Sequence, residues 1–168
     1  MPFRKIEARE IQGNPFRMVG DQWFLLTAGD RERCNTMTCG WGGLGVLWQL
    51  DVAVCYVRPQ RYTLEFMEKS EYYTMSFFGE QYRKQLLLCG SKSGRDTDKA
   101  AACGFTTVFA ECGAPYFAEA ELVLVCKKIY WADLDPGHFL DDRISACYKT
   151  NDYHRVYVGE IIEALKKD

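Results

Sequence analysis

The sequence lacks the features that usually mark a metal site, a nucleic-acid-binding surface or a membrane span. It has two histidines, His138 and His154, and its eight cysteines include no C-x-x-C pair, whereas zinc sites need clustered ligands. The net charge of −2 gives no basic footprint for nucleic acid. No run approaches the roughly 18 apolar residues of a membrane-spanning helix, and the N-terminus has no apolar signal-peptide region. We therefore expect a cytoplasmic protein without metal, nucleic-acid or membrane partners, with reduced and buried cysteines.

The length and composition suit one domain with a large core. A chain of 168 residues has room for such a core, so we expect a single domain over residues 1–168. Hydrophobic residues make up 48% and aromatic residues 14% of the chain. Surplus apolar surface of this kind often becomes an oligomer interface.

Short apolar or alternating runs between turns predict a mainly β structure. Strands are expected at 23–28, 34–39, 51–58, 72–78, 105–110, 114–117, 122–131 and 154–162, the last with a bulge near Gly159. Short helices are expected at 63–69, 80–89, about 97–103 and 142–148. Residues 1–22 look irregular. The irregular spacing of the strands favours a β-barrel with helical insertions over a regular β-α-β alternation.

Helix-capping residues give the expected ends of these helices. Thr63 and either Asp96 or Thr97 are suited to cap the helices that follow them. Gly90 and Gly104 stand where a glycine would end a helix in a left-handed conformation.

A polar, glycine-rich stretch at 35–45 is the most informative segment of the chain. Asn35, Thr36 and Thr38 supply an amide and two hydroxyls, and four glycines follow between Gly40 and Gly45. Glycines leave backbone N–H groups uncovered, so a ligand can approach the main chain closely. The segment predicts a site for a phosphate and a flat ring.

The same glycines match the dinucleotide-binding pattern G-x-G-x-x-G over 40–45. That pattern works where the glycines join a strand to a helix whose N-terminus meets the pyrophosphate. Here only residues 46–50 separate the glycines from the next expected strand, and this segment is too short for such a helix. We therefore reject a Rossmann site.

Three further patches carry chemistry of a similar kind. Segment 56–63 ends a strand with two arginines, an amide and hydroxyls. Segment 91–96, with Lys99 one turn later, offers hydroxyls and cations suited to a phosphate. Segment 152–160 holds His154 among aromatic and charged residues. Each patch alone could be a solvated strand end, an ordinary capped turn or a structural histidine, but together they are unusual in a small acidic chain.

These patches, in this order, resemble the flavin reductase family and more closely its flavoredoxin-like branch. The resemblance rests on 35–38, 41–43, 56–63, 93–96 with Lys99, and 154–160. It implies the FMN-binding split-barrel fold, an antiparallel Greek-key barrel, and a homodimer with FMN near the subunit interface.

The resemblance also implies the residues that contact FMN. These are Asn35, Thr36, Met37, Thr38, Cys39, Arg58, Gln60, Arg61, Tyr62, Thr63, Ser93, Gly94, Arg95 and Lys99, with Trp41 lining the ring's pocket and His154 as a candidate substrate contact. No residue is expected to act as an acid, a base or a nucleophile, since hydride transfer needs mainly positioning.

The expected function is that of an FMN-dependent oxidoreductase which passes a hydride from NADH or NADPH to flavin. Two alternatives stay open. One is a flavoredoxin-like electron carrier that receives electrons from a redox protein partner and has no NAD(P)H activity. The other is a non-catalytic FMN-binding module.

Overall fold

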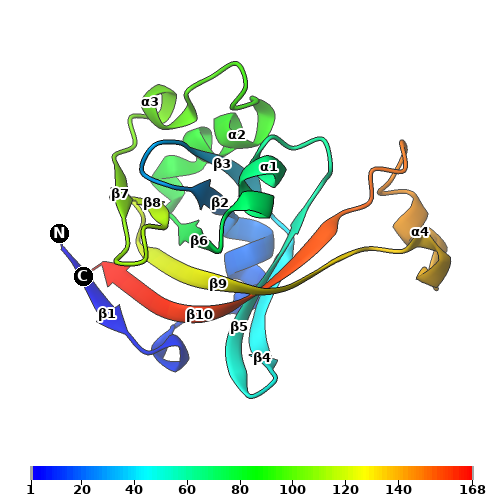
Figure 1. Ribbon diagram of the computed structural model, residues 1–168, viewed down its shortest axis with the longest axis horizontal. Coiled ribbons are helices and arrows are strands. Elements are labelled where there is room, and N and C mark those ends of the chain that lie inside the picture. Colours follow the sequence, from blue (N-terminus) through cyan, green and yellow to red (C-terminus); the bar gives the residue numbers. More distant parts are fainter. Residues whose placement is uncertain (1, 168) are drawn as a thin grey trace.

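Strands dominate the computed structural model, which describes residues 2–167 (Figure 1). The strands are β1 (Phe3–Ile6), β2 (Phe24–Gly29), β3 (Cys34–Cys39), β4 (Gly42–Leu47), β5 (Leu50–Val57), β6 (Tyr72–Phe77), β7 (Thr107–Phe109), β8 (Pro115–Phe117), β9 (Leu122–Asp133) and β10 (Arg155–Lys167). The α-helices are α1 (Thr63–Lys69), α2 (Arg83–Ser91), α3 (Lys99–Cys103) and α4 (Asp142–Ser145). Shorter 3-10 turns occupy Ala8–Glu10, Glu80–Tyr82 and Pro136–His138, and a π-helix spans Arg17–Gln22.

The large sheet is antiparallel throughout. Its strand order is β3-β2-β6-β9-β10-β5-β4, and β1 pairs with the far end of β10. Strand β10 pairs with β9 along most of its length and with β5 through its first half. Strands β7 and β8 form a separate small ribbon. The structure confirms the expected mainly β architecture with helical insertions.

Two hydrophobic clusters lie on opposite faces of the sheet. Successive residues of a strand point to opposite faces, so the nearly all-apolar segments in β2 and β9 supply both clusters. In β9, Leu124 belongs to one cluster and its neighbours Val123 and Val125 to the other. In β2, Leu26 and Leu25 are divided in the same way. Residues 24–28 are therefore buried on both faces of the sheet.

The N-terminal region and the glycine-rich segment differ from the sequence-based expectation. Residues 3–6 form β1 against 164–167 of β10, which places the two ends of the chain side by side (Figure 1). This pairing joins segments at opposite ends of the sequence, so no local pattern reveals it. Residue 1 of the segment expected to be irregular lies outside the described residues. Gly42, Gly43 and Gly45 belong to β4, which forms a hairpin with β5.

Several helix ends also differ from expectation. Gly90 lies inside α2, which continues to Ser91. Thr63 is the buried first residue of α1 and makes no cap bond. Helix α3 begins after Asp98, whose carboxylate accepts a hydrogen bond from the Ala101 N–H. Gly104 ends α3 with φ of 67°, as predicted.

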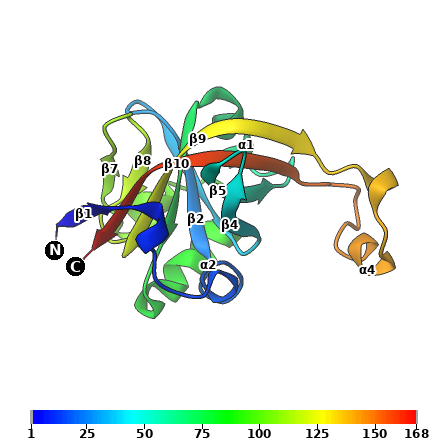
Figure 2. The same cartoon turned by 90° about the horizontal axis from the view of Figure 1, so that it is seen from below.

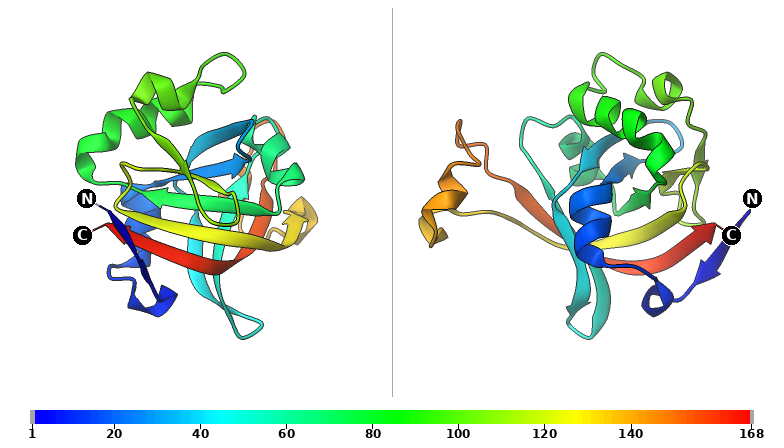
Figure 3. Two further views of the ribbon diagram at one scale, coloured as in Figure 1. Left: turned by 60° about the vertical axis from the view of Figure 1, so that its left-hand side comes forward. Right: turned by 180° about the vertical axis from the view of Figure 1, so that it is seen from behind.

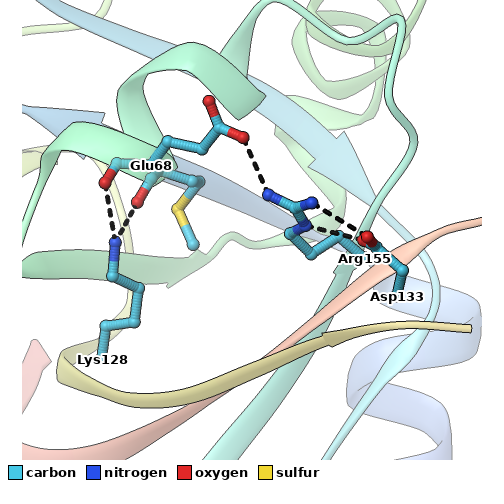
Figure 4. A network of polar contacts seen from close by, with 5 residues as sticks. Glu68, Lys128, Asp133 and Arg155 are labelled. Atoms are coloured by element: carbon cyan, nitrogen blue, oxygen red, sulfur yellow. Dashed lines mark hydrogen bonds and ion pairs between the residues drawn. The ribbon is translucent and has the colours of Figure 1, made fainter.

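A charged network holds α1 against the long β9–β10 hairpin (Figure 4). Arg155 on β10 binds Asp133 on β9 and Glu68 on α1. Lys128 donates to the carbonyls of Met67 and Glu68 at the C-terminal end of α1, where a cation also complements the helix dipole. The network fixes α1 and therefore the segment 58–62 that leads into it.

The connection between β9 and β10 projects away from the sheet as an arm that carries α4 (Figures 2 and 3). We call residues 134–154 the arm. Leu140 in the arm is 97% exposed, whereas Tyr148 and His154 at its base are buried. In the part of the chain from 2 to 167, no helix is both long and apolar enough to cross a bilayer.

Candidate functional site

A cleft of about 470 Å³ opens where the end of β3 meets the residues after β5, the outer part of α2 and the base of the arm. Its volume is within the range of small-molecule sites, about 300–1,000 Å³. The lining residues are Trp23, Met37, Thr38, Cys39, Gly40, Trp41, Tyr56, Arg58, Arg61, Leu86, Leu87, Gly90, Ser91 and His154.

The β3 wall of the cleft is a sheet edge. Within residues 2–167 only β2 pairs with β3, so one side of its backbone is not used by a neighbouring strand. Thr38 Oγ1 donates to the Leu86 carbonyl and so ties α2 to this edge. A Cβ at Gly40 would lie 3.0 Å from the indole of Trp23. The lack of a side chain at Gly40 lets the indole pack directly on the main chain.

Arg61 brings an unsatisfied donor to the cleft. Its Nη1 donates to the Gly90 carbonyl over 2.8 Å. Its Nη2 is buried and finds no hydrogen-bond partner within the described residues. A buried polar group without a partner is costly, most of all on a charged side chain. A ligand with an anionic or carbonyl oxygen would satisfy this nitrogen.

Arg58 is held at the rim of the cleft by the arm. Its Nη1 pairs with Asp152 Oδ2 and its Nη2 donates to the Cys147 carbonyl over 2.8 Å. Gln60 Nε2 also donates to Asp152, over 2.7 Å. The guanidinium of Arg58, followed by the amide of Gln60, holds the pKa of the Asp152 carboxyl well below its usual range. Arg58 therefore has a fixed position.

His154 lies between aromatic rings at the base of the arm. Its ring centroid is 5.0 Å from that of Trp41 and 6.3 Å from that of Tyr56. Its Nδ1 lies 2.7 Å from the Tyr148 hydroxyl. Burial, reinforced by the charge of Arg58, lowers the pKa of His154 to about 4. The imidazole is therefore neutral at pH 7.

The structure brings part of the predicted set to this cleft and part to its surroundings. The residues at the cleft are Met37, Thr38, Cys39, Trp41, Arg58, Arg61 and His154. The residues that line an adjacent cavity of about 680 Å³ are Asn35, Thr36, Gly94, Arg95 and Lys99. Tyr62 lines a third cavity, and Thr63 is buried at the start of α1. Gln60 binds Asp152, and the Ser93 hydroxyl accepts from the Arg95 N–H.

Residues outside the cleft bind other parts of the protein. Asn35 Nδ2 donates to Thr63 Oγ1 over 2.8 Å, and a Cβ at Gly94 would overlap the Asn35 amide. Arg95 pairs with Glu65 over 2.6 Å and stacks on the Tyr62 ring. Contact of these residues with a flavin stays a prediction.

Lys99 is the most deeply placed of the predicted cations. Its Nζ donates to the carbonyls of Thr36, over 2.7 Å, and Cys89, over 2.9 Å. Burial, with a smaller effect from Arg61, lowers its pKa to about 8. Lys99 braces β3 against α2 and α3.

Several cleft residues were not among the predicted contacts. They are Trp23, Tyr56, Leu86, Leu87, Gly90 and Ser91. Tyr148 and Asp152, which bind the cleft residues His154 and Arg58, were also not predicted. Trp23 has φ of 68°, a left-handed conformation that is uncommon outside glycine, so its residue type did not indicate this position. In the sequence, the leucines of α2 have the pattern of ordinary core residues, so they were not singled out.

The cysteines partly follow expectation. Cys39, Cys55, Cys89 and Cys126 are buried, and no disulfide joins any cysteines of the described chain. Cys112 and Cys147 are exposed, contrary to the expectation of burial.

Comparison with solved structures shows the same fold in flavin proteins. Flavoredoxin from Methanosarcina acetivorans is 25% identical, with a TM-score of 0.69 over 97% of this chain and 77% of that one. An FMN-binding protein from Thermus thermophilus is 18% identical, with a TM-score of 0.70 over 98% and 82%. An NADH:FAD oxidoreductase from Streptomyces globisporus is 17% identical, with a TM-score of 0.64 over 87% and 74%. No curated protein matches the sequence.

The family comparison is more specific than the fold. The family described as "Flavin reductase like domain" matches residues 16–167, which include every strand except β1. The resemblance seen in the sequence is therefore confirmed, including the split barrel. This match supports a flavin-related redox function, and the chain belongs to the family of flavin reductase like domains.

Proposed function

We propose that the chain binds FMN in the cleft described above and passes a hydride from NADH or NADPH to it. The observation that carries this proposal is the buried, unpartnered Nη2 of Arg61 in the wall of a cleft that also has indole and leucine surfaces. Such a cleft suits a ligand that is flat and apolar at one end and anionic or rich in oxygen at the other.

The residues present fit the chemical parts of FMN. Trp23, Trp41 and Leu86 offer apolar and aromatic surface for a ring system. Arg58 and Arg61 offer guanidinium groups for oxygen acceptors, and Ser91 offers a hydroxyl. The free edge of β3 offers main-chain groups for the polar rim of a ring.

A bound flavin would supply the hydride-accepting chemistry, so the protein has mainly to position the reactants. Arg58 is fixed by Asp152 and does not need to be ordered when a ligand arrives. His154 carries no charge at pH 7, and its bond to Tyr148 orients the ring. Nε2 is then the imidazole atom left to contact a substrate.

A flavoredoxin-like electron carrier is the second candidate. It is favoured by the 25% identity to the Methanosarcina acetivorans flavoredoxin over 97% of this chain. In that case a redox protein would deliver the electrons, and neither nicotinamide would react.

We also propose that the chain forms a homodimer. Apolar side chains are exposed on the β4–β5 hairpin, at the cleft and on the arm. Val46 and Trp48 are 65% and 58% exposed, Trp41 is 49% exposed, and Leu140 is almost fully exposed. Large apolar side chains exposed in this way often mark a protein interface. Sedimentation equilibrium would report the mass: a dimer supports the proposal and a monomer contradicts it.

The test of the flavin proposal is an absorption spectrum of the purified protein, taken before and after addition of FMN and desalting. Retained yellow colour supports the proposal, and lack of flavin uptake overturns it. Anaerobic addition of NADH or NADPH then follows. Loss of the visible flavin band supports the reductase. Reduction only by a ferredoxin-type protein supports the carrier.

A further inference from the structure

Helices α2 and α3 bring two thiols into contact beside the cleft. Cys89 on α2 is fully buried and Cys103 on α3 is partly exposed, and their Sγ atoms are 3.6 Å apart. A disulfide bond is about 2.05 Å long. The sulfur atoms therefore need to approach by only about 1.5 Å, a shift that small side-chain rotations can supply.

The two helices are held face to face by bonds that do not involve the sulfur atoms. Lys99, at the start of α3, donates to the Cys89 carbonyl on α2 and to the Thr36 carbonyl on β3. Helix α3 has a capping side chain from Asp98 at its beginning and a left-handed Gly104 at its end. These bonds therefore hold α2 and α3, and with them the two thiols, in the same relative position whether or not a disulfide forms.

We propose that Cys89 and Cys103 form a reversible disulfide that ties α2 to α3 and fixes the segment between them. That segment, 92–98, carries Ser93, Gly94 and Arg95. Helix α2 also supplies Leu86 and Leu87 to the wall of the cleft. Cross-linking would therefore slow the release of a ligand from the cleft; this second part rests on the proposed flavin function.

The oxidant would be a low-molecular-weight disulfide. The Cys103 thiolate attacks one sulfur of that disulfide, forming a mixed disulfide and releasing one thiolate. Cys89 then loses its proton to solvent and attacks Cys103 Sγ, which releases the second thiolate. The protein gives up two electrons and two protons, and the small disulfide becomes two thiols.

The surroundings of the pair make this exchange slow. Burial raises the pKa of Cys89 to about 12 and also raises the pKa of Cys103, while the nearby charge of Lys99 opposes both shifts. The hydrogen bond between the sulfur atoms lowers the pKa of Cys103 and raises that of Cys89. Cys103, the more accessible thiol, is therefore the attacking group.

Peptide mapping of the whole protein tests the disulfide without any flavin measurement. The protein is incubated with oxidised glutathione, alkylated, and digested with trypsin and a glutamate-specific protease. Cleavage at Lys84 and Lys92 isolates Cys89, and cleavage at Lys99 and Glu111 isolates Cys103. We expect peptides 85–92 and 100–111 to be linked, and separated by a reductant. Alkylation of Cys103 with no link between these peptides would overturn the proposal.

Two single variants sharpen the assignment. Cys103→Ser should abolish the linked peptide, whereas Cys112→Ser, which alters an exposed thiol, should leave it unchanged. Loss of the link in both variants would contradict the pairing.

The flavin part has a separate readout. We expect FMN to dissociate several-fold more slowly from the oxidised protein than from the reduced protein, with no such difference in Cys103→Ser. Equal rates in a protein whose disulfide is mapped would overturn the effect on release. A protein that takes up no FMN would overturn the proposed function while the mapped disulfide stands.

Discussion

Arg58, the first residue after β5, forms an ion pair with Asp152, 94 residues further along the chain. The pair joins the rim of the cleft to the base of the arm. Gln60 binds the same carboxylate oxygen, so one side chain of the arm fixes two residues of the 58–63 segment. The position of Arg58 at the cleft therefore depends on the arm.

Asp152→Asn should lower the melting temperature at pH 7, because it keeps the side-chain shape and removes the charge that Arg58 and Gln60 bind. The folded protein holds the Asp152 pKa below its usual value, which is about 4. The carboxylate thus stabilises the fold above that pH, and its contribution is lost as the pH falls through the lowered pKa. Thermal melts of both proteins should converge in acid. A constant difference at every pH would contradict this assignment.

Arg61→Met should weaken FMN binding by about 10- to 100-fold, the range expected for a lost hydrogen bond to a charged group. The variant removes the buried, unpartnered Nη2 but also the Nη1 bond to the Gly90 carbonyl. Because these two effects oppose each other, its stability should change little. Titration of the apoprotein with FMN gives the affinity. Equal affinities of the variant and the wild type would show that Nη2 is not a flavin contact.

Arg95→Met is the matched comparison. Arg95 is half exposed and paired with Glu65 outside the cleft, and a surface pair of this kind contributes little stability. The geometry predicts a smaller effect on FMN affinity than that of Arg61→Met. A larger effect would show that the 93–95 segment reaches the ligand, as the sequence resemblance implies.

Acid should destabilise the protein through His154. Its pKa is about 4 in the folded state and about 6.5 in an unfolded chain. Between these values the unfolded state binds more protons, so stability falls as the pH falls from about 6.5 to about 4, by at most about 3 kcal/mol. Urea denaturation of His154→Gln should lack this component, while His138→Gln, which alters an exposed ring, should keep it. Identical pH profiles for His154→Gln and the wild type would refute the prediction.

Gly159→Ala should destabilise the fold by about 1–3 kcal/mol, as overpacking of a core does. A Cβ at 159 would lie 2.8 Å from the Cys126 Cβ and would overlap the Tyr73 hydroxyl. At Gly43, by contrast, a Cβ would meet no atom within 4 Å, so Gly43→Ala should change stability by less than about 0.5 kcal/mol. Urea denaturation of the two variants measures both effects, and equal losses would contradict the packing argument.

The parts of the fold predicted from sequence are those with a local cause. Alternation and apolar runs predicted β3 over 34–39 and the positions of β6 and β9. The predicted bulge near Gly159 is present as a register shift after Val158. Strand β4 was missed because its glycines carry no apolar alternation. It forms through backbone pairing with β5, across a turn at Trp48 and Gln49 in which both residues have positive φ.

The site was predicted in part for a related reason. Met37, Thr38, Arg58 and Arg61 reach the cleft because each stands at or near the end of a strand. The leucines of α2 reach it, and Asp152 reaches Arg58 at its rim, only through contacts across the fold, which spacing does not encode. Lysine is a typical phosphate ligand, but the Nζ of Lys99 donates hydrogen bonds to two backbone carbonyl groups instead.

The arrangement around β10 has a consequence for the order of assembly. This strand bonds to β1, β5 and β9, yet it is made after all of them. During translation the earlier strands must wait, with unpaired backbone edges and apolar faces uncovered, until the ribosome has released residues 155–167. Such long-range closure slows folding and exposes a nascent chain to aggregation, so chaperone demand during synthesis should be high.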